Sequence, residues 1–76
     1  MISVAMTTYN GEKYISNQLR SIFNQTVHVD EIIICDDGST DRTIEKIKEF
    51  SDKRIKLKIN SENIGYVKNF SQAIGL

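Results

Sequence analysis

The run Ile32-Ile33-Ile34-Cys35 is apolar and mostly β-branched, and it stops abruptly at two aspartates and a glycine. Its apolar residues do not alternate with polar ones, which is typical of a strand that is covered on both faces. Strands of this kind belong to parallel sheets that carry helices on their faces. We therefore predict a buried strand over residues 31–35 within an α/β fold.

The residues before and after this strand predict alternating strands and helices. A short apolar strand over residues 2–6 leads into an amphipathic helix over residues 12–24. After the buried strand, Ser39 and Thr40 are expected to cap a second helix, and Asp41 suits the positive end of that helix. Its inward residues are expected to be Ile44, Ile47 and Phe50.

The C-terminal part of the chain continues this order. Residues 54–59 alternate between apolar and basic side chains, which predicts a half-exposed edge strand. A third helix is expected from about residue 66, where apolar residues again recur at helical spacing; they include Val67, Phe70, Ala73 and Ile74. The whole order predicts a three-layer α/β fold with a parallel sheet and right-handed crossovers. The sequence ends in apolar residues, which suggests that one more strand would follow.

Composition narrows the possible partners. Ten basic residues balance ten acidic ones, so no net field would draw the chain to nucleic acid or to an anionic membrane. The apolar runs are far shorter than the roughly 20 residues of a membrane span. A single cysteine and the lack of a signal peptide in residues 1–76 suit a reducing cytoplasm, which is the expected location.

Two polar clusters follow the first two strands. Thr7, Thr8, Tyr9 and Asn10 form the first cluster, and the second contains Asp36, Asp37 and Gly38. Ligands of open α/β sheets bind beyond the carboxyl ends of the strands. Because adjacent parallel strands end at the same edge of the sheet, we expect the two clusters to form one pocket.

A tyrosine ring near a carboxylate can hold a nucleobase, the ring by stacking and the carboxylate by accepting a hydrogen bond. Uracil, thymine and guanine carry a ring N–H that an ionised aspartate can accept; neutral adenine and cytosine do not. The prediction is therefore a uridine, thymidine or guanosine nucleotide. Simpler roles remain open, because residues 36–40 could form only a turn and a helix cap, and Tyr9 could be a packing residue. Lys68 and Asn69 could face a phosphate from the start of the third helix, or be a solvated lysine and a helix-start asparagine.

With these motifs, the sequence resembles the family 2 glycosyltransferases, which share the GT-A fold. The likeness includes residues 3–10, Asn24-Gln25-Thr26, residues 31–41 and Asn63-Ile64-Gly65. Residues 65–70 are also similar to the branch that adds rhamnose or related sugars to bacterial cell-surface polysaccharides. The resemblance implies that Thr7 and Tyr9 line the base site, that Asp37 holds the base, and that Asp36 lies beside it.

The resemblance also implies an inverting transfer of a sugar from a nucleoside diphosphate to a saccharide acceptor hydroxyl. In the family, an Asp-x-Asp pair after a fourth strand binds a divalent metal, Mg or Mn, and a later carboxylate is the catalytic base. Residues 1–76 contain no Asp-x-Asp. We therefore expect them to be the N-terminal nucleotide-sugar-binding part of the enzyme, truncated before that pair, without metal and without transferase activity of their own.

Two other functions compete with this interpretation. A receiver-like signalling domain is also doubly wound and acidic at its strand ends, although its acidic pair follows the first strand. A non-catalytic α/β fragment is the second alternative. Under any of these interpretations, an unpaired strand at the truncated edge of the sheet could template a homodimer.

Overall fold

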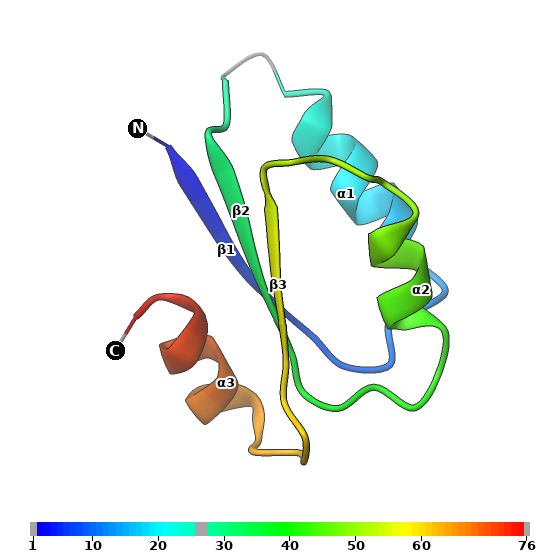
Figure 1. Ribbon diagram of the computed structural model, residues 1–76, viewed down its shortest axis with the longest axis vertical. Helices are drawn as coiled ribbons and strands as arrows, with labels where there is room; N and C mark the ends of the chain where they lie inside the picture. Colours follow the sequence, from blue (N-terminus) through cyan, green and yellow to red (C-terminus); the bar gives the residue numbers. More distant parts are fainter. Residues whose placement is uncertain (1, 26–27, 76) are drawn as a thin grey trace.

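The computed structural model describes residues 2–25 and 28–75, and within them strands and helices alternate (Figure 1). The strands are β1 (Ser3–Thr8), β2 (Glu31–Asp36) and β3 (Ile55–Ile59), and the helices are α1 (Ile15–Phe23), α2 (Thr43–Lys48) and α3 (Tyr66–Ala73). This order confirms the α/β prediction. Thr26, which belongs to one of the motifs behind the resemblance, lies outside the described residues.

The sheet is parallel, with the strand order β1-β2-β3. Its register aligns Thr8 with Asp36 and Asp36 with Ile59, so the three strands end at the same level. Backbone hydrogen bonds extend this alignment by one residue, from Asp37 N–H to the Thr8 carbonyl and from Asn60 N–H to the Asp36 carbonyl. The predicted edge position of β3 is confirmed. Within the described sheet β1 is the other edge, and pairing of two chains through the truncated edge of the sheet stays a prediction.

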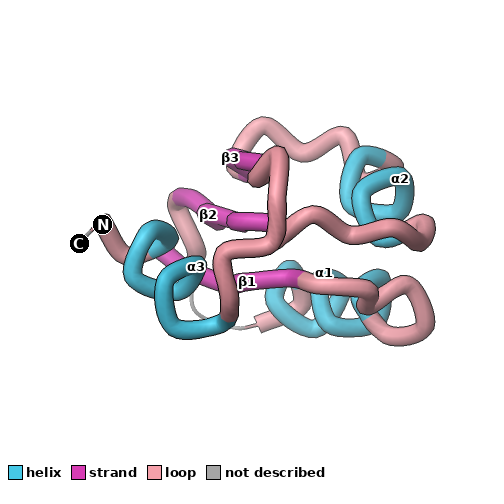
Figure 2. The backbone as a smooth tube through the Cα atoms, turned by 90° about the horizontal axis from the view of Figure 1, so that it is seen from below, coloured by secondary structure: helices cyan, strands magenta, loops and turns pink. Residues whose placement is uncertain are grey.

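Helices cover both faces of the sheet, with α1 and α2 on one face and α3 on the other (Figure 2). The main core lies on the α1 and α2 side and is formed by Ile15, Leu19, Val29, Ile32, Ile34 and Ile47. Side chains alternate along a strand, so Ile33 and Cys35 of β2 point to the α3 side. Burial of one such large aliphatic side chain contributes about 1.5–3 kcal/mol. The doubly covered strand that the apolar run predicted is thus β2.

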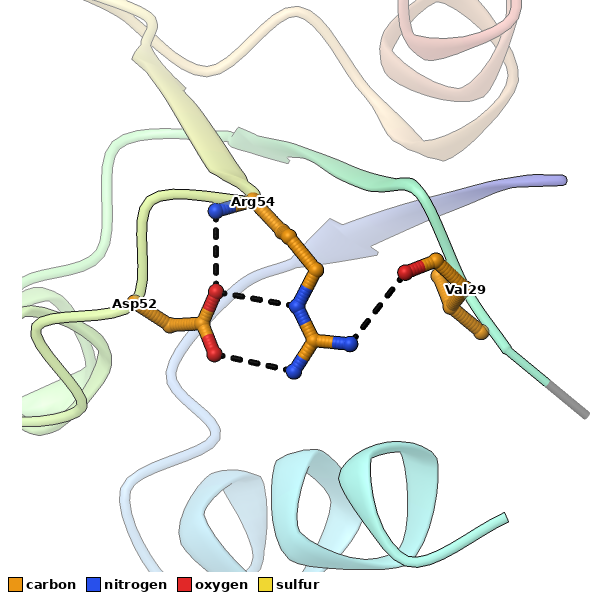
Figure 3. Close-up of polar contacts among 3 residues, drawn as sticks. All are labelled: Val29, Asp52 and Arg54. Carbon is orange, nitrogen blue, oxygen red and sulfur yellow. Dashed lines mark hydrogen bonds and ion pairs between the residues drawn. The ribbon is translucent and has the colours of Figure 1, made fainter. Parts of the chain in front are cut away.

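At the amino ends of the strands, Arg54 links the turn before β3 to the segment that precedes β2 (Figure 3). The Arg54 guanidinium donates two hydrogen bonds to Asp52, at 3.0 and 2.9 Å, and a third to the Val29 carbonyl at 3.2 Å. It also lies 4.9 Å from the centre of the Phe23 ring of α1. This cluster secures the end of the sheet opposite to the predicted pocket.

The start of α2 differs from the prediction that Ser39 and Thr40 cap it. The helix begins at Thr43, and the Asp41 carboxylate accepts the Thr43 N–H at 3.0 Å. Ser39 does not serve as a cap because its hydroxyl donates to Asp36, and the Thr40 N–H is taken by the side chain of Asn10. Ser39 thus forms a hydrogen bond within the loop after β2, and Thr40 forms one with the loop after β1, so neither caps the helix.

The apolar residues predicted for the third helix do not all face the sheet. Ala73 is buried, but Val67, Phe70 and Ile74 are 75%, 40% and 46% exposed. The position that packs most deeply is Asn69, at 1% exposure. The inner side of α3 therefore brings polar groups, not only apolar ones, to the sheet.

Candidate functional site

A cavity of about 260 Å³ opens at the carboxyl ends of β1 and β2, next to the start of α3. It is lined by Thr7, Thr8, Tyr9, Asp37, Asn63, Gly65 and Asn69. The structure thus brings residues of the two predicted polar clusters together. Pockets that enclose a drug-sized ligand measure about 300–1,000 Å³, so this one suits a part of a nucleotide, such as its base.

Asp36 is fully buried and lies outside the lining formed by the described residues. Its Oδ1 accepts hydrogen bonds from the hydroxyls of Thr8 (2.7 Å) and Ser39 (2.6 Å). Its Oδ2 accepts the N–H groups of Gly38 (3.1 Å) and Ser39 (2.8 Å). A carboxylate has about four acceptor positions, and protein donors take all of them. Here the structure differs from the expectation of a ligand-binding Asp36, because this residue shapes the loop instead.

Asp37 is 4% exposed and does line the cavity. Its Oδ1 accepts hydrogen bonds from the Ile64 N–H at 2.8 Å and the Asn60 amide at 3.0 Å, and its Oδ2 accepts the Gly65 N–H at 3.0 Å. The Ile64 bond, followed by those of Asn60 and Gly65, lowers the pKa of Asp37 despite the opposing effect of burial. Asp37 is therefore an ionised carboxylate that three hydrogen bonds fix in place, and its Oδ2 can accept one more hydrogen bond.

Tyr9 contributes the aromatic surface of the cavity. The residue directly follows β1 and is 51% exposed, so its ring is accessible at the cavity mouth. Thr7 and Thr8, the last two residues of β1, also line the cavity, and the Thr8 hydroxyl donates to Asp36. An exposed ring and a fixed carboxylate that line the same cavity are suited to holding a nucleobase.

Three other predicted residues lie outside this lining. Asn10 joins the two loops, since its side-chain oxygen accepts the Thr40 N–H at 2.8 Å. Gly38, at a φ of 80°, allows the turn in which its N–H reaches Asp36. Lys68 is an exposed residue of α3. The first two shape the site, while no described contact brings Lys68 to it.

Two residues that line the cavity, Asn63 and Gly65, were not predicted from the sequence as ligand contacts, and Asn69 was considered only as a residue that could face a phosphate. Asn69 is joined to a further buried asparagine, Asn60, whose side-chain nitrogen donates to the Asn69 oxygen at 3.0 Å. One signal for it was available. Asn69 lies four residues before Ala73 and so on the same side of a helix, where a polar residue inside an apolar stripe indicates a buried contact.

The described residues do not fit a divalent cation. Among them, no three His, Cys, Asp or Glu side chains gather where they could hold a metal ion. Asp36 has no acceptor position left, and Asp37 has three positions occupied by protein donors. No chemical step is therefore assigned to a metal at this site.

A second hollow, of about 390 Å³, lies along β3, lined mainly by Ile47, Ile55, Leu57 and Ile59 with a few polar neighbours. It shares no lining residue with the cavity at the ends of β1 and β2. In the described ranges, no helix is long and apolar enough to cross a membrane.

Comparison with known proteins agrees with the resemblance. The family model described as Glycosyl transferase family 2 matches residues 3–76. An uncharacterized glycosyltransferase of Haemophilus influenzae is 42% identical over 77 residues, which cover 99% of this chain and 24% of that protein. A UDP-Glc:alpha-D-GlcNAc-diphosphoundecaprenol beta-1,3-glucosyltransferase of Escherichia coli is 45% identical over 60 residues, covering 79% of this chain and 24% of that protein.

Among solved structures, residues 1–349 of TarS from S. aureus match with a TM-score of 0.86 and 32% identity, over 96% of this chain and 23% of that one. The likeness supports the prediction of an N-terminal GT-A portion. The chain thus spans about a quarter of the length of these relatives. The narrower resemblance to the rhamnose-adding branch stays a prediction. A family model that matches nearly the whole chain shows that it belongs to glycosyl transferase family 2.

Proposed function

We propose that this chain binds the nucleotide of a nucleoside-diphosphate sugar, with the base between Tyr9 and Asp37. The observation that carries the proposal is the Asp37 carboxylate, which is fixed by three protein donors and lines a cavity next to an exposed tyrosine ring. Thr7 and the loop residue Asn63 complete the walls. Asp36 supports the loop and leaves ligand contact to its neighbour.

The base is one that carries a ring N–H. All three groups that bond to Asp37 among the described residues are donors, so the remaining position on Oδ2 calls for another donor. Uracil, thymine and guanine supply it. The name of the Escherichia coli relative specifies a UDP-linked donor, which favours uridine within this class.

The reaction that we assign to the whole enzyme is inverting transfer of the sugar to an acceptor hydroxyl in the synthesis of a bacterial surface polysaccharide. Residues 1–76 contain no Asp-x-Asp pair, and the carboxylate among the described lining residues, Asp37, already accepts three protein donors. Binding without transfer is therefore the expected behaviour of these residues alone. Cys35, a buried free thiol, suits a reducing cytoplasm as the place of the reaction. Family membership leaves the receiver-like alternative without support.

Titration of the chain with the diphosphates of uridine, thymidine, guanosine and adenosine, followed by amide NMR shifts, tests this proposal. The first three are expected to shift the amides of Tyr9, Asp37 and Gly65, and adenosine diphosphate is expected to bind at least about tenfold more weakly. Equal binding of all four would overturn the base assignment, and no binding of any would overturn the function.

Asp37→Asn gives the matched test of the carboxylate. A hydrogen bond to a charged group contributes about 1.5–3 kcal/mol, so affinity for uridine diphosphate should fall about tenfold or more. The control is Asp41→Asn, because Asp41 also accepts backbone N–H groups, from Glu12 and Thr43, but lies outside the cavity lining. If both variants lose the same affinity, the effect reflects stability and not base contact.

A further inference from the structure

Behind Asp37 lies a chain of buried amide groups that begins at a backbone carbonyl. The Asn69 side-chain nitrogen donates to the Cys35 carbonyl oxygen at 2.7 Å. The Asn69 side-chain oxygen accepts from the Asn60 nitrogen at 3.0 Å, and that same nitrogen donates to Asp37 Oδ1 at 3.0 Å. Gln72 donates to the Asn60 oxygen at 2.9 Å and to the Asn69 oxygen at 3.2 Å.

These hydrogen bonds are consistent with only one orientation of the Asn60 and Asn69 side-chain amides. A backbone carbonyl can only accept, so Asn69 must point its NH₂ group at Cys35 and its oxygen at Asn60. Asn60 must then offer its own NH₂ group, whose two hydrogens reach Asn69 and Asp37. The group that faces Asp37 from behind is thereby fixed as a donor.

We propose that Asn69 is a positioning residue for base selection, acting through Asn60 to keep Asp37 an acceptor toward the cavity. The inference rests on the proposed nucleotide function. Without Asn69, the Asn60 and Gln72 amides can invert together, and Asn60 can then turn its oxygen toward Asp37. A protonated or displaced Asp37 would no longer distinguish a ring N–H from a bare ring nitrogen.

The burial of the group makes this control effective. Asn69 is 1% exposed and Asn60 is 9% exposed, so water has little access with which to replace a lost partner. Low local polarity strengthens each remaining bond and raises the cost of an unpaired group. The amide orientation that the Cys35 carbonyl imposes on Asn69 therefore also fixes the orientation of the Asn60 amide at the cavity.

The test compares uridine diphosphate, whose base carries a ring N–H, with cytidine diphosphate, whose base has an unprotonated nitrogen at that position. The unaltered chain is expected to favour the uridine compound. Asn69→Leu, which keeps a similar volume, should reduce the ratio of the two affinities about three- to tenfold. A ratio that stays unchanged in folded Asn69→Leu overturns the inference.

Thr43→Val is the matched control, because Thr43 is also fully buried and accepts the Gly11 N–H at 2.8 Å, outside the cavity lining. It should reduce stability and leave the ratio unchanged. If Asn69 had only a structural role, Asn69→Leu would also leave the ratio unchanged, because loss of folded protein weakens the binding of both nucleotides equally.

If Asn69→Leu does not fold, NMR of the unaltered chain tests whether the Asn60 NH₂ group faces Asp37. The Asn60 NH₂ group and the Ile64 N–H both point at Asp37 Oδ1, so a nuclear Overhauser effect should connect their protons. Its absence, with both signals assigned, would overturn the inference. Selective binding by the unaltered chain combined with a failed Asn69 test would leave the proposed function standing, whereas no nucleotide binding at all would remove the function itself.

Discussion

The Thr8 hydroxyl donates a 2.7 Å hydrogen bond to Oδ1 of Asp36, and so joins the last residues of β1 and β2 inside the protein. The same carboxylate accepts two N–H groups of the loop that follows β2. This loop begins with Asp37, the residue that reaches the cavity. One aspartate therefore sets the backbone from which its neighbour contacts a ligand.

Asp36→Asn is expected to lower the free energy of unfolding. The amide NH₂ group would face two of the four donors that now reach the carboxylate, and each buried donor left unpaired costs about 1–3 kcal/mol. Urea unfolding measures the change. In the control, Asp30→Asn at an exposed carboxylate, the effect should stay within about 0.5 kcal/mol. A similar small effect at Asp36 would mean that the four bonds contribute little.

Tyr9→Ala should weaken nucleotide binding and leave stability nearly unchanged. The side chain is about half exposed, so its removal costs little packing, whereas stacking of a base on an aromatic ring contributes about 1–3 kcal/mol. Calorimetric titration with uridine diphosphate should show a loss of about tenfold. Tyr14→Ala is the matched control, because Tyr14 is 61% exposed and lies outside the cavity lining. Equal losses at both positions would contradict the stacking role.

Much of the fold could be predicted because it depends on periodic apolar residues. The run before Asp36 indicated a doubly covered parallel strand, and the structure places Ile32 and Ile34 on one side of it and Cys35 on the other. The element boundaries were less accurate. The helix expected from residue 12 begins at Ile15, because the Gly11 carbonyl accepts the N–H groups of Tyr14 and Ile15 in a preceding turn.

The site was predictable only in part, because the partners of its polar groups are distant in sequence. Ser39 is locally typical of a helix cap, but its hydroxyl oxygen accepts the N–H of Asn10, 29 positions earlier. The Asn69 side-chain nitrogen donates to the carbonyl of Cys35, 34 positions earlier. Local sequence shows that such residues can form hydrogen bonds; it does not show with which group.

Acid should destabilise the chain through Asp52. Hydrogen bonds from the side chain and then the backbone N–H of Arg54 lower the pKa of Asp52, more than burial raises it. A carboxyl that binds its proton less tightly when folded contributes stability above its unfolded pKa, near 3.9, and loses it as the pH falls through the folded value. Urea unfolding between pH 7 and pH 2.5 measures this loss.

Arg54→Met tests whether this loss originates in the cluster of Figure 3. Removal of the guanidinium takes away the side-chain bonds that hold the Asp52 carboxylate, so the variant should be less stable at pH 7 and its stability should fall less steeply below pH 4. The pKa values of Asp37 and Asp41 are lowered as well, so part of the acid dependence should remain. An unchanged slope would assign the acid dependence to those residues instead.

Gly65→Ala should destabilise the loop that holds Asp37. Gly65 has φ 88° and ψ 157°, a region that is essentially restricted to glycine and costs other residues about 1–3 kcal/mol. A Cβ at this position would meet no heavy atom of the described chain within 4 Å, so the cost comes from the backbone and not from a clash. Since the Gly65 N–H donates to Asp37 Oδ2, affinity for uridine diphosphate should fall together with stability.

Ser51→Gly is the control for Gly65→Ala, because it should change stability in the opposite direction or not at all. Ser51 is exposed and has a φ of 49°, in the left-handed region where a side chain is unfavourable, so glycine should leave stability unchanged or raise it slightly. It also lies outside the lining of the nucleotide cavity, and nucleotide affinity should not change. If Gly65→Ala reduced stability without reducing affinity, the Gly65 bond to Asp37 would support the fold alone, and base binding would depend on the bonds from Ile64 and Asn60.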